Sequence, residues 1–135
     1  MNRDYLQNAA TISQFICANF YNPDGGFNSG NSAGGNDSNT RQIDENICLS
    51  RFLNLLHYYL DEESFLCLAR HGLAYLSTPE VATSRIEEAG ILLLDEELNT
   101  TPLKIHIIAK DSPGGAAKLA EKALRYFGWY KVIHC

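Results

Sequence analysis

A glycine- and asparagine-rich stretch, NPDGGFNSGNSAGGNDSNTRQIDEN, runs from Asn22 to Asn46 and interrupts an otherwise helical pattern. Its middle, GNSAGGNDSN, has almost no apolar residue and cannot bury enough surface to offset the entropy cost of ordering it. We therefore predict a loop that separates one helix from the rest of the chain. Residues Gly30 to Asn39 are expected to be its most mobile part.

Apolar residues recur at spacings of three and four on both sides of this loop, which is typical of amphipathic helices. After the loop, Asp44 is expected to cap a second helix, and a third begins near Asp61. The very short connection between these two helices predicts an antiparallel hairpin. Before the loop, we predict a helix over Arg3 to Phe20 whose apolar stripe consists of Leu6, Ala9, Ile12, Ile16 and Phe20, joined by Phe15.

The sequence beyond the hairpin predicts two short helical pieces, one after Thr78-Pro79 and one over Ala89 to Leu98. The β-branched run Leu103 to Ala109 predicts a strand, and Tyr130 to Ile133 predicts a second one. Ser112 is expected to cap the helix between them, which makes the strands a parallel pair. The expected buried side of that helix consists of Ala117, Leu119, Ala120, Ala123, Leu124 and Phe127.

These elements predict an α+β fold that is mainly α, with antiparallel helical hairpins followed by a small C-terminal β-α-β unit. The length of 135 residues suits a single domain over residues 1–135. Its parts are a helix over 1–20, the loop over 21–43, the helical part over 44–98 and the β-α-β part over 103–135.

The charge of the chain argues against two classes of partner. Eleven Lys and Arg against sixteen Asp and Glu give a net charge of −5, without a basic run that would neutralise a phosphate backbone or an anionic bilayer. The longest apolar runs are also far shorter than the roughly 20 residues that span a membrane. We therefore expect no nucleic acid and no membrane among the partners.

The four cysteines are widely spaced and form no Cys-x-x-Cys pair. A disulfide scaffold or a zinc site would need closer or repeated spacing, so Cys17, Cys48, Cys67 and Cys135 are expected to be reduced and buried as small hydrophobes. Reduced thiols and the absence of a signal-peptide pattern at the start of the sequence favour a cytoplasmic location.

No metal or cofactor site is predicted. Gly114-Gly115 opens a helix after a strand, but a complete dinucleotide motif and a P-loop lysine are both missing. His106 and His134 could lie on neighbouring strands with Cys135 nearby, yet the histidines lack ligand spacing, and we expect ordinary strand side chains.

The two ends of the loop carry the candidate ligand-binding residues. Its entry allows a tight turn that presents an aromatic ring, and its exit brings charges to the start of the second helix. Grouped carboxylates can do acid and base work on a sugar if their pKa values differ; helix capping with a solvated turn is the structural alternative. No residue is assigned a catalytic role, and the candidates are Asp24, Phe27, Arg41, Asp44 and Glu45.

Two segments resemble the C-terminal part of thioredoxin-domain-containing proteins, a family that includes the spermatogenesis-associated thioredoxin-like proteins and their bacterial relatives. They are IDENICLSRFLNLLHYYLDEESFLCLARHGLAYLSTPEVA and AGILLLDEELNTTPLKIHII, with their glutamate-asparagine, RFLNLL and threonine-proline motifs. The resemblance implies helical hairpins of an α/α toroid similar to six-hairpin glycosidases and sugar epimerases, with the candidate residues lining its funnel. The family's thioredoxin-like domain and most of its toroid hairpins have no counterpart in this sequence.

The favoured interpretation is a structural and interaction module without independent catalysis. The second helix is apolar on more than one stripe, so we expect self-association into a homo-oligomer, or binding of the missing toroid segments, through that helix. The alternatives are a sugar-directed enzyme or carbohydrate-binding site of the six-hairpin type, and thiol-disulfide exchange, for which the sequence lacks the cysteine pair.

Overall fold

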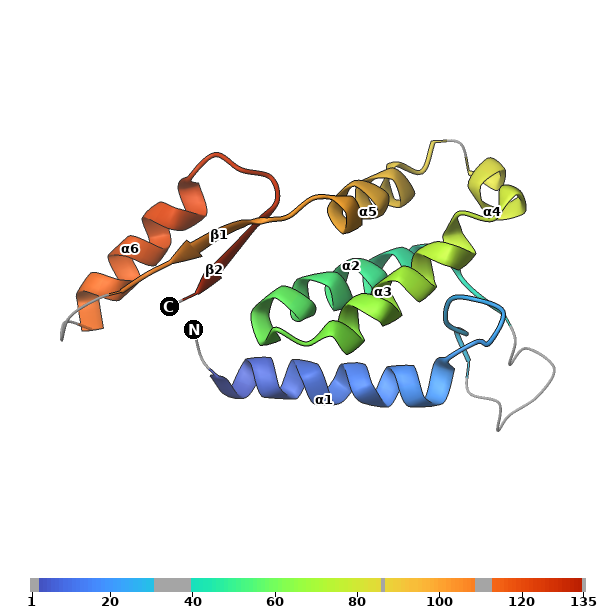
Figure 1. Ribbon diagram of the computed structural model, residues 1–135, viewed down its shortest axis with the longest axis horizontal. Helices are drawn as coiled ribbons and strands as arrows, with labels where there is room; N and C mark the ends of the chain where they lie inside the picture. Colours follow the sequence, from blue (N-terminus) through green and yellow to red (C-terminus); the bar gives the residue numbers. More distant parts are fainter. Residues whose placement is uncertain (1–2, 31–39, 86, 109–112, 135) are drawn as a thin grey trace.

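The computed structural model describes residues 3–30, 40–85, 87–108 and 113–134 (Figure 1). Within them the chain is mainly helical with one small parallel sheet, which confirms the predicted α+β class. The elements are α1 (Arg3–Phe20), α2 (Ile43–Leu60), α3 (Glu63–Leu76), α4 (Pro79–Ser84), α5 (Ala89–Asn99), β1 (Leu103–His106), α6 (Pro113–Arg125) and β2 (Lys131–His134). Residues 31–39, which cover most of the segment predicted to be mobile, lie outside the described part.

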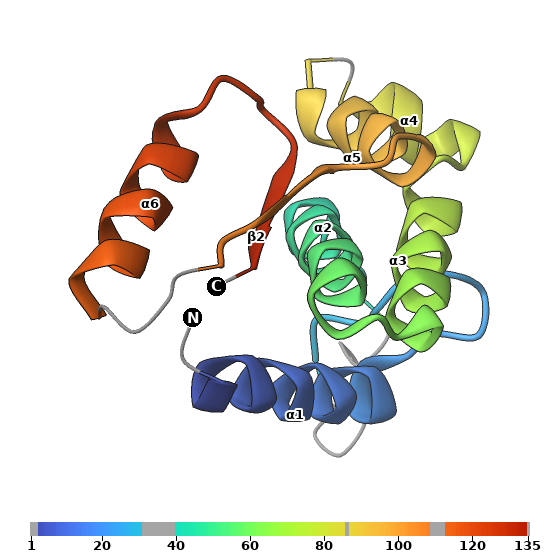
Figure 2. The same cartoon turned by 60° about the vertical axis from the view of Figure 1, so that its left-hand side comes forward.

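Helix α2 is the centre of the fold. It packs against α1, α3, α5 and β2, and Figure 2 shows these elements around it. Leu53 and Leu56 on α2, Phe65 and Leu76 on α3, and Leu94 on α5 are fully or almost fully buried. Four elements rather than one cover α2, and among the described residues Phe52, at 40%, is the large apolar residue of α2 that stays exposed.

Helix α1 has the predicted bounds but not the predicted buried stripe. Ala10 and Ser13 are the residues of α1 that are buried, and the Ser13 hydroxyl donates to the Ala9 carbonyl oxygen at 2.8 Å. Ile12 and Phe15 are 57% and 59% exposed. The physical reason is that α1 forms an outer layer on α2, so one face of α1 is covered and its remaining apolar residues face outward.

The hairpin of α2 and α3 forms as predicted, with two differences at the helix ends. Asp61 ends α2 in the left-handed conformation at φ 58° rather than starting α3. The N-cap of α2 is Gln42, and Asp44 lies within the first turn, where it pairs with Arg85 instead of capping. Both differences shift an element boundary by a residue or two and leave the antiparallel pair intact.

The short pieces after the hairpin also follow the prediction. Helix α4 begins at Pro79 with Thr78 in the N-cap position, and α5 ends one residue beyond the expected Leu98. The Thr78 hydroxyl, however, donates back to the Tyr75 carbonyl oxygen at 3.0 Å instead of accepting from the helix. It therefore satisfies the end of α3 rather than the start of α4.

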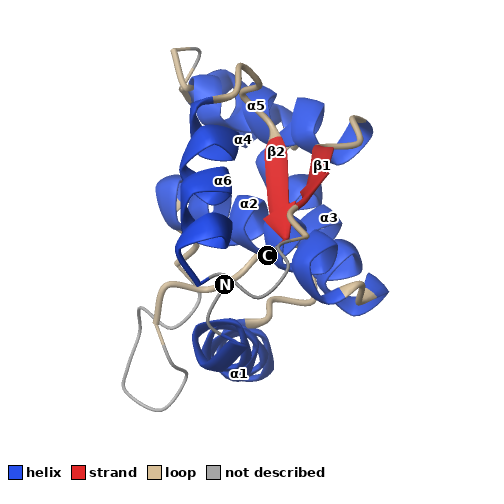
Figure 3. Cartoon of the chain, turned by 90° about the vertical axis from the view of Figure 1, so that its left-hand side faces the viewer, coloured by secondary structure: helices blue, strands red, loops and turns tan. Residues whose placement is uncertain are grey.

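Strands β1 and β2 pair in parallel, as predicted, with Leu103 opposite Lys131 and His106 opposite His134 (Figure 3). The regular part of β1 ends at His106, short of the expected Ala109. Ala109 and Ser112, the expected strand end and helix cap, lie outside the described residues. Burial, followed by the nearby charges of His106 and Lys104, lowers the pKa of His134.

Helix α6 buries less of its apolar side than predicted. Ala123 is buried, whereas Leu124 is 66% exposed and Phe127, beyond the end of the helix, is 98% exposed. Leu119 and Ala117 are exposed as well. A sheet of two strands is too narrow to cover a whole helix face, so of the expected residues Ala123 is buried and Ala120 is half-buried. The helix ends at Arg125, three residues before the expected Gly128. The Lys131 ammonium group donates to the carbonyl oxygens of Leu124 and Tyr126 on either side of this end.

The cysteines differ from their predicted burial. Cys17 is half-buried, and its burial raises the pKa of its thiol to about 11. Cys48 on α2 and Cys67 on α3 are exposed, so the prediction of buried thiols is wrong for both. Cys135 lies outside the described residues.

In the part of the chain that the structure describes, no helix has both the length and the hydropathy of a membrane-spanning segment.

Candidate functional site

The Asp24-Gly25-Gly26-Phe27 turn is locked onto the hairpin by one amide side chain. Gly25 and Gly26 adopt φ of 107° and 72°, which other residues rarely adopt. The Phe27 backbone N–H donates to Asn46 Oδ1 at 2.7 Å, and Asn46 Nδ2 donates to the Phe27 carbonyl oxygen at 2.9 Å. A Cβ on Gly26 would lie 2.7 Å from that same Oδ1, so glycine is required for this close approach.

His71 on α3 holds the other side of the turn. Its Nε2 lies 2.9 Å from the Asn22 carbonyl oxygen and 3.1 Å from that of Gly26, so Nε2–H is the donor. The imidazole also stacks on the Tyr21 ring at 4.1 Å between centroids and meets the edge of Phe27. As a result the aromatic ring that was expected to be presented by the turn is buried between α2 and α3.

Arg41 fixes the exit of the loop. Its guanidinium donates to the Gly25 carbonyl oxygen at 2.8 Å and lies over the Tyr75 ring, 4.3 Å from the centroid. The Tyr75 hydroxyl in turn donates to the Arg41 carbonyl oxygen at 2.9 Å. These contacts join the two ends of the loop, and they occupy the Arg41 side chain in positioning the turn.

The three candidate carboxylates have different surroundings. Asp24 is exposed at the turn, and Asp44 forms an ion pair with Arg85 at 2.8 Å. Glu45 lines a hollow between α1 and α2. Because successive residues project about 100° apart around a helix, Asp44 and Glu45 face different sides of α2. The structure thus places Phe27 and Glu45 at the same hollow, whereas Arg41 contacts Gly25 and Tyr75 and Asp44 pairs with Arg85 at the end of α4.

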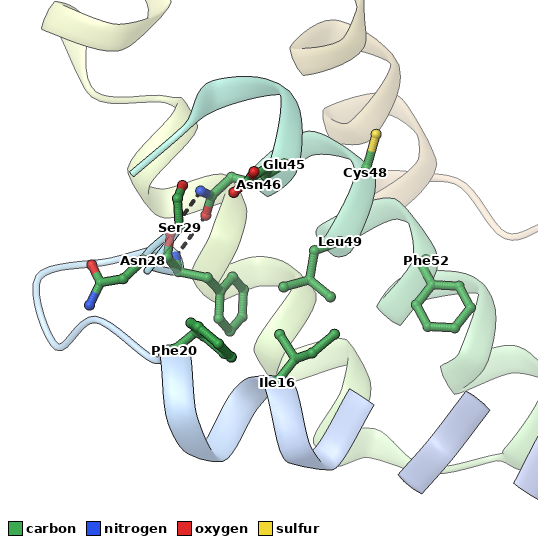
Figure 4. Close-up of a pocket in the computed structure, with 10 residues that line it drawn as sticks. Ile16, Phe20, Asn28, Ser29, Glu45, Asn46, Cys48, Leu49 and Phe52 are labelled. Carbon is green, nitrogen blue, oxygen red and sulfur yellow. Dashed lines mark hydrogen bonds between the residues drawn. The ribbon is translucent and has the colours of Figure 1, made fainter. Parts of the chain in front are cut away.

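The hollow beside Glu45 is an apolar groove between α1 and α2, with a volume of about 470 Å³. Figure 4 shows Ile16 from α1 and Leu49 from α2 pointing toward one another across it. Phe20, Phe27 and Phe52 add aromatic rings to its walls. Asn28, Ser29, Glu45, Asn46 and Cys48 complete the lining.

A second hollow of about 320 Å³ continues the groove toward the start of α1 and the end of α2. Phe52 lines both hollows, so they adjoin along the same pair of helices. The lining of this part is almost entirely apolar and consists of Tyr5, Leu6, Ala9, Phe52, Leu55, Leu56 and Tyr59. We call the two hollows together the α1/α2 groove.

Most polar groups at the loop end of the α1/α2 groove are already bonded. Asn28 Oδ1 accepts from Asn22 Nδ2 at 2.8 Å, and Ser29 Oγ accepts from the Gln42 backbone N–H at 3.0 Å. The Asn46 amide is used by the turn. Among the described residues that line the groove, Glu45 carries the carboxylate. A ligand in the groove would therefore meet one charged group and a long apolar surface.

A buried polar network, which the sequence analysis did not identify, joins the helical part to the C-terminal unit. Arg51 donates to both carboxylate oxygens of Glu97 at 2.9 and 2.6 Å, and Glu97 is only 5% exposed. Asn54 Nδ2 donates to the Tyr130 hydroxyl at 2.8 Å. Glu97 raises the pKa of Arg51, and burial is the main cause that raises the pKa of Tyr130.

Asn46 and His71 were likewise not identified from the sequence. A useful signal was available for Asn46 and Asn54, since an amide inside an otherwise apolar helix must find a hydrogen-bond partner when it is buried. His71 gave no such signal, because its partners are backbone carbonyl groups far away in the sequence.

No protein-family model, curated protein or solved structure matches this chain. Its function is therefore inferred from the described residues.

Proposed function

We propose that this chain is a structural and interaction module that assembles through the α1/α2 groove, without catalysis of its own, and that its partner there is a second copy of the chain. The observation that carries this proposal is the apolar spacing on both walls of the groove. The lining residues include Tyr5, Ala9 and Ile16 on α1 and Leu49, Phe52, Leu56 and Tyr59 on α2. Ile12 completes the same spacing on α1.

Both sets alternate spacings of three and four residues, the heptad pattern by which helices pack side chains into one another. Ile12 does not line either hollow, but it lies on the same helix face between Ala9 and Ile16, and it is exposed. An apolar seam of this kind along each of two neighbouring helices is suited to a further layer of helices rather than to a small polar ligand.

A second copy would supply a layer of two apolar helices whose length matches the groove. Helices α1 and α2 have 18 residues each, which corresponds to about 27 Å. Two copies related by a two-fold axis would place one α1/α2 layer on the other, as in a four-helix bundle. The lining of the α1/α2 groove has no charged residue along its middle and carries Glu45 at one end. Pairing of two copies through this groove therefore brings no like charges together at the centre of the interface.

The exposed area is consistent with a specific dimer. Tyr5 is 75% exposed, Ile12 57% and Phe52 40%. Because a whole large side chain has about 150–250 Å² of surface, these three side chains together leave roughly 330 Å² uncovered in each copy. A symmetric pair would thus bury about half of the roughly 1,200 Å² of a stable interface from these three residues. The half-buried lining residues of both copies can supply the remainder.

The resemblance to an α/α toroid offers another occupant. In that interpretation the groove would be covered by a neighbouring helical hairpin that is missing from this sequence. The isolated chain distinguishes the two occupants, because only a second copy can fill the groove in a pure sample.

Sedimentation velocity at micromolar protein tests the proposal. The wild-type chain is expected to be a dimer, and Ile12→Glu and Phe52→Glu are each expected to shift it to monomer by placing a carboxylate in an apolar interface. Leu92→Glu is the matched control, because Leu92 is an equally apolar and exposed residue on α5, away from the groove. Far-UV circular dichroism of each variant confirms that its helices are retained.

Two outcomes would overturn the proposal. A wild-type chain that stays monomeric would assign the groove to another segment, such as a missing toroid hairpin. Dissociation by Leu92→Glu but not by the groove variants would place the interface on α5.

A carbohydrate site is the second candidate, because Glu45 lines the same hollow as the rings of Phe20 and Phe27. A panel of sugars in a heat-shift assay tests it, since a ligand that binds only the folded state raises the unfolding midpoint. The assembly proposal predicts no shift. A shift that disappears in Glu45→Gln would favour the sugar site instead.

A further inference from the structure

We propose that His106 on β1 and His134 on β2 form a two-histidine binding site for a divalent transition-metal ion of the zinc, nickel and copper class. This site is independent of the α1/α2 groove and of the proposed assembly. Neither histidine lines the groove, although Tyr59, whose ring lies 5.5 Å from that of His134, does.

The parallel register of the sheet brings the two imidazoles together. His106 and His134 are directly opposite each other on neighbouring strands. Their rings stack with centroids 4.9 Å apart and planes inclined by 10°. Because each nitrogen lone pair lies in the plane of its ring, both rings must turn out of the stack before one nitrogen of each points at the same ion.

The two rings are near enough for a chelate. Zn–N bonds of about 2.0–2.1 Å at a tetrahedral angle separate two ligand nitrogens by roughly 3.4 Å. Ring centroids 4.9 Å apart allow the two side chains to reach that nitrogen separation by rotating about their side-chain bonds. His106 is exposed at the sheet surface and can rotate, while the Tyr59 ring, 5.5 Å away, supports His134. Water would fill the remaining coordination positions.

The choice of metal follows from the donor atoms. Imidazole nitrogen suits zinc, copper and nickel, whereas magnesium and calcium prefer carboxylate and carbonyl oxygen. No third metal-binding side chain joins the pair among the described residues, so the ion would be held by two protein ligands.

Lys104 modulates the site. It lies two residues before His106 on β1, and its ammonium group is 5.3 Å from the centre of the Tyr58 ring. A fixed positive charge on the same strand face opposes the binding of a cation. Removing this charge should therefore tighten metal binding, an effect that is specific to an ion bound at the histidine pair.

Calorimetric titration of the full chain with Ni²⁺ tests the proposal, in a Cys135→Ser background so that the adjacent thiol cannot serve as a ligand. We expect one saturable site, its loss in His106→Gln and in His134→Gln, and tighter binding in Lys104→Gln. His57→Gln is the matched control, because His57 contacts the Glu62 carbonyl oxygen at the α2–α3 turn, and it should bind Ni²⁺ as the background does. Mg²⁺ should give no binding heat.

Since His106 is exposed, His106→Gln is the variant least able to disturb folding. Ni²⁺ binding that survives in His106→Gln, or that is lost equally in His57→Gln, would overturn the proposal. An unchanged affinity in Lys104→Gln would also contradict the assigned position of the ion.

Discussion

Asn46 on α2 binds both polar groups of the Phe27 backbone, accepting from its N–H at 2.7 Å and donating to its carbonyl oxygen at 2.9 Å. The same Nδ2 also donates to the Gln42 carbonyl oxygen at 2.8 Å. One side chain therefore satisfies both backbone groups of Phe27, and it joins the loop to the start of α2.

Replacing Asn46 by alanine should destabilise the fold. The change leaves the buried Phe27 N–H and carbonyl groups without their side-chain partner, which costs about 1–3 kcal/mol for each unsatisfied group. Urea unfolding measures this loss. Asn99→Ala serves as the control, because that exposed amide bonds only within α5, and its effect should be near zero. Equal midpoints for the two variants would show that the Asn46 bonds contribute little.

Gly72→Ala should destabilise the α2–α3 hairpin through overpacking. A Cβ at position 72 would lie 1.8 Å from Ser50 Oγ and 3.1 Å from Ser50 Cβ. Such a clash costs about 1–3 kcal/mol of unfolding free energy.

The serine provides a rescue experiment. Ser50 Oγ is buried and has no hydrogen-bond partner in the structure, so Ser50→Ala alone should change stability little. In the Gly72→Ala/Ser50→Ala double variant the Oγ atom is gone, which removes the 1.8 Å contact. The double variant should therefore regain part of the stability that Gly72→Ala loses. If Ser50→Ala gives no recovery, the clash involves other atoms.

Arg51→Met should destabilise the chain because it leaves the Glu97 carboxylate buried without its cation. Losing one partner of a buried pair costs about 3–5 kcal/mol, but the Arg51 side chain is 39% exposed, so screening reduces our expectation to about 1–3 kcal/mol. Chemical unfolding of Arg51→Met, Glu97→Met and the double variant forms a mutant cycle. We expect the double variant to be less damaged than the sum of the two single ones, and strict additivity would exclude coupling.

Cys17 should react with iodoacetamide more slowly than Cys48 or Cys67. It is half-buried with a pKa raised to about 11, so its thiolate is scarce at pH 8, whereas the other two are exposed. Mass spectrometry of tryptic peptides reports the order of labelling.

The raised pKa of Cys17 should make the fold less stable at alkaline pH. The thiol pKa is 9.0 in the unfolded reference and about 11 in the fold, so folding stability is intact below pH 9 and falls as the pH rises toward 11. Cys17→Ala should remove this part of the alkaline loss. An unchanged alkaline transition would contradict the assignment to Cys17.

Local patterns in the sequence were sufficient to predict the elements. The three-four spacing gave the bounds of α1, and the β-branched run with its partner near the C-terminus gave the parallel pair. Which apolar face is buried depends on neighbours that local spacing does not specify. For that reason Ile12 on α1 and Leu124 on α6 were expected inside the fold and are exposed.

In the candidate site, too, local sequence patterns indicated the residues but not their long-range contacts. The loop ends were recognised by their glycines and charges, but Phe27 points inward because His71 and Asn46, distant in the sequence, hold its turn. The ion pair of Asp44 with Arg85 depends on the placement of α4 relative to α2, which no local pattern indicates. Long-range partners of this kind decide which candidate residues remain available to a ligand.

The most direct measurement of the proposed assembly is an isotope-filtered NOE experiment on an equal mixture of labelled and unlabelled chains. This experiment detects only contacts between copies. We predict contacts from the methyl groups of Ile12 and Leu49 of one copy to the rings of Tyr5 or Phe52 of the other, across the α1/α2 groove. Contacts between copies that involve α6 side chains such as Leu124 and omit the groove, or the absence of any such contacts, would contradict the account.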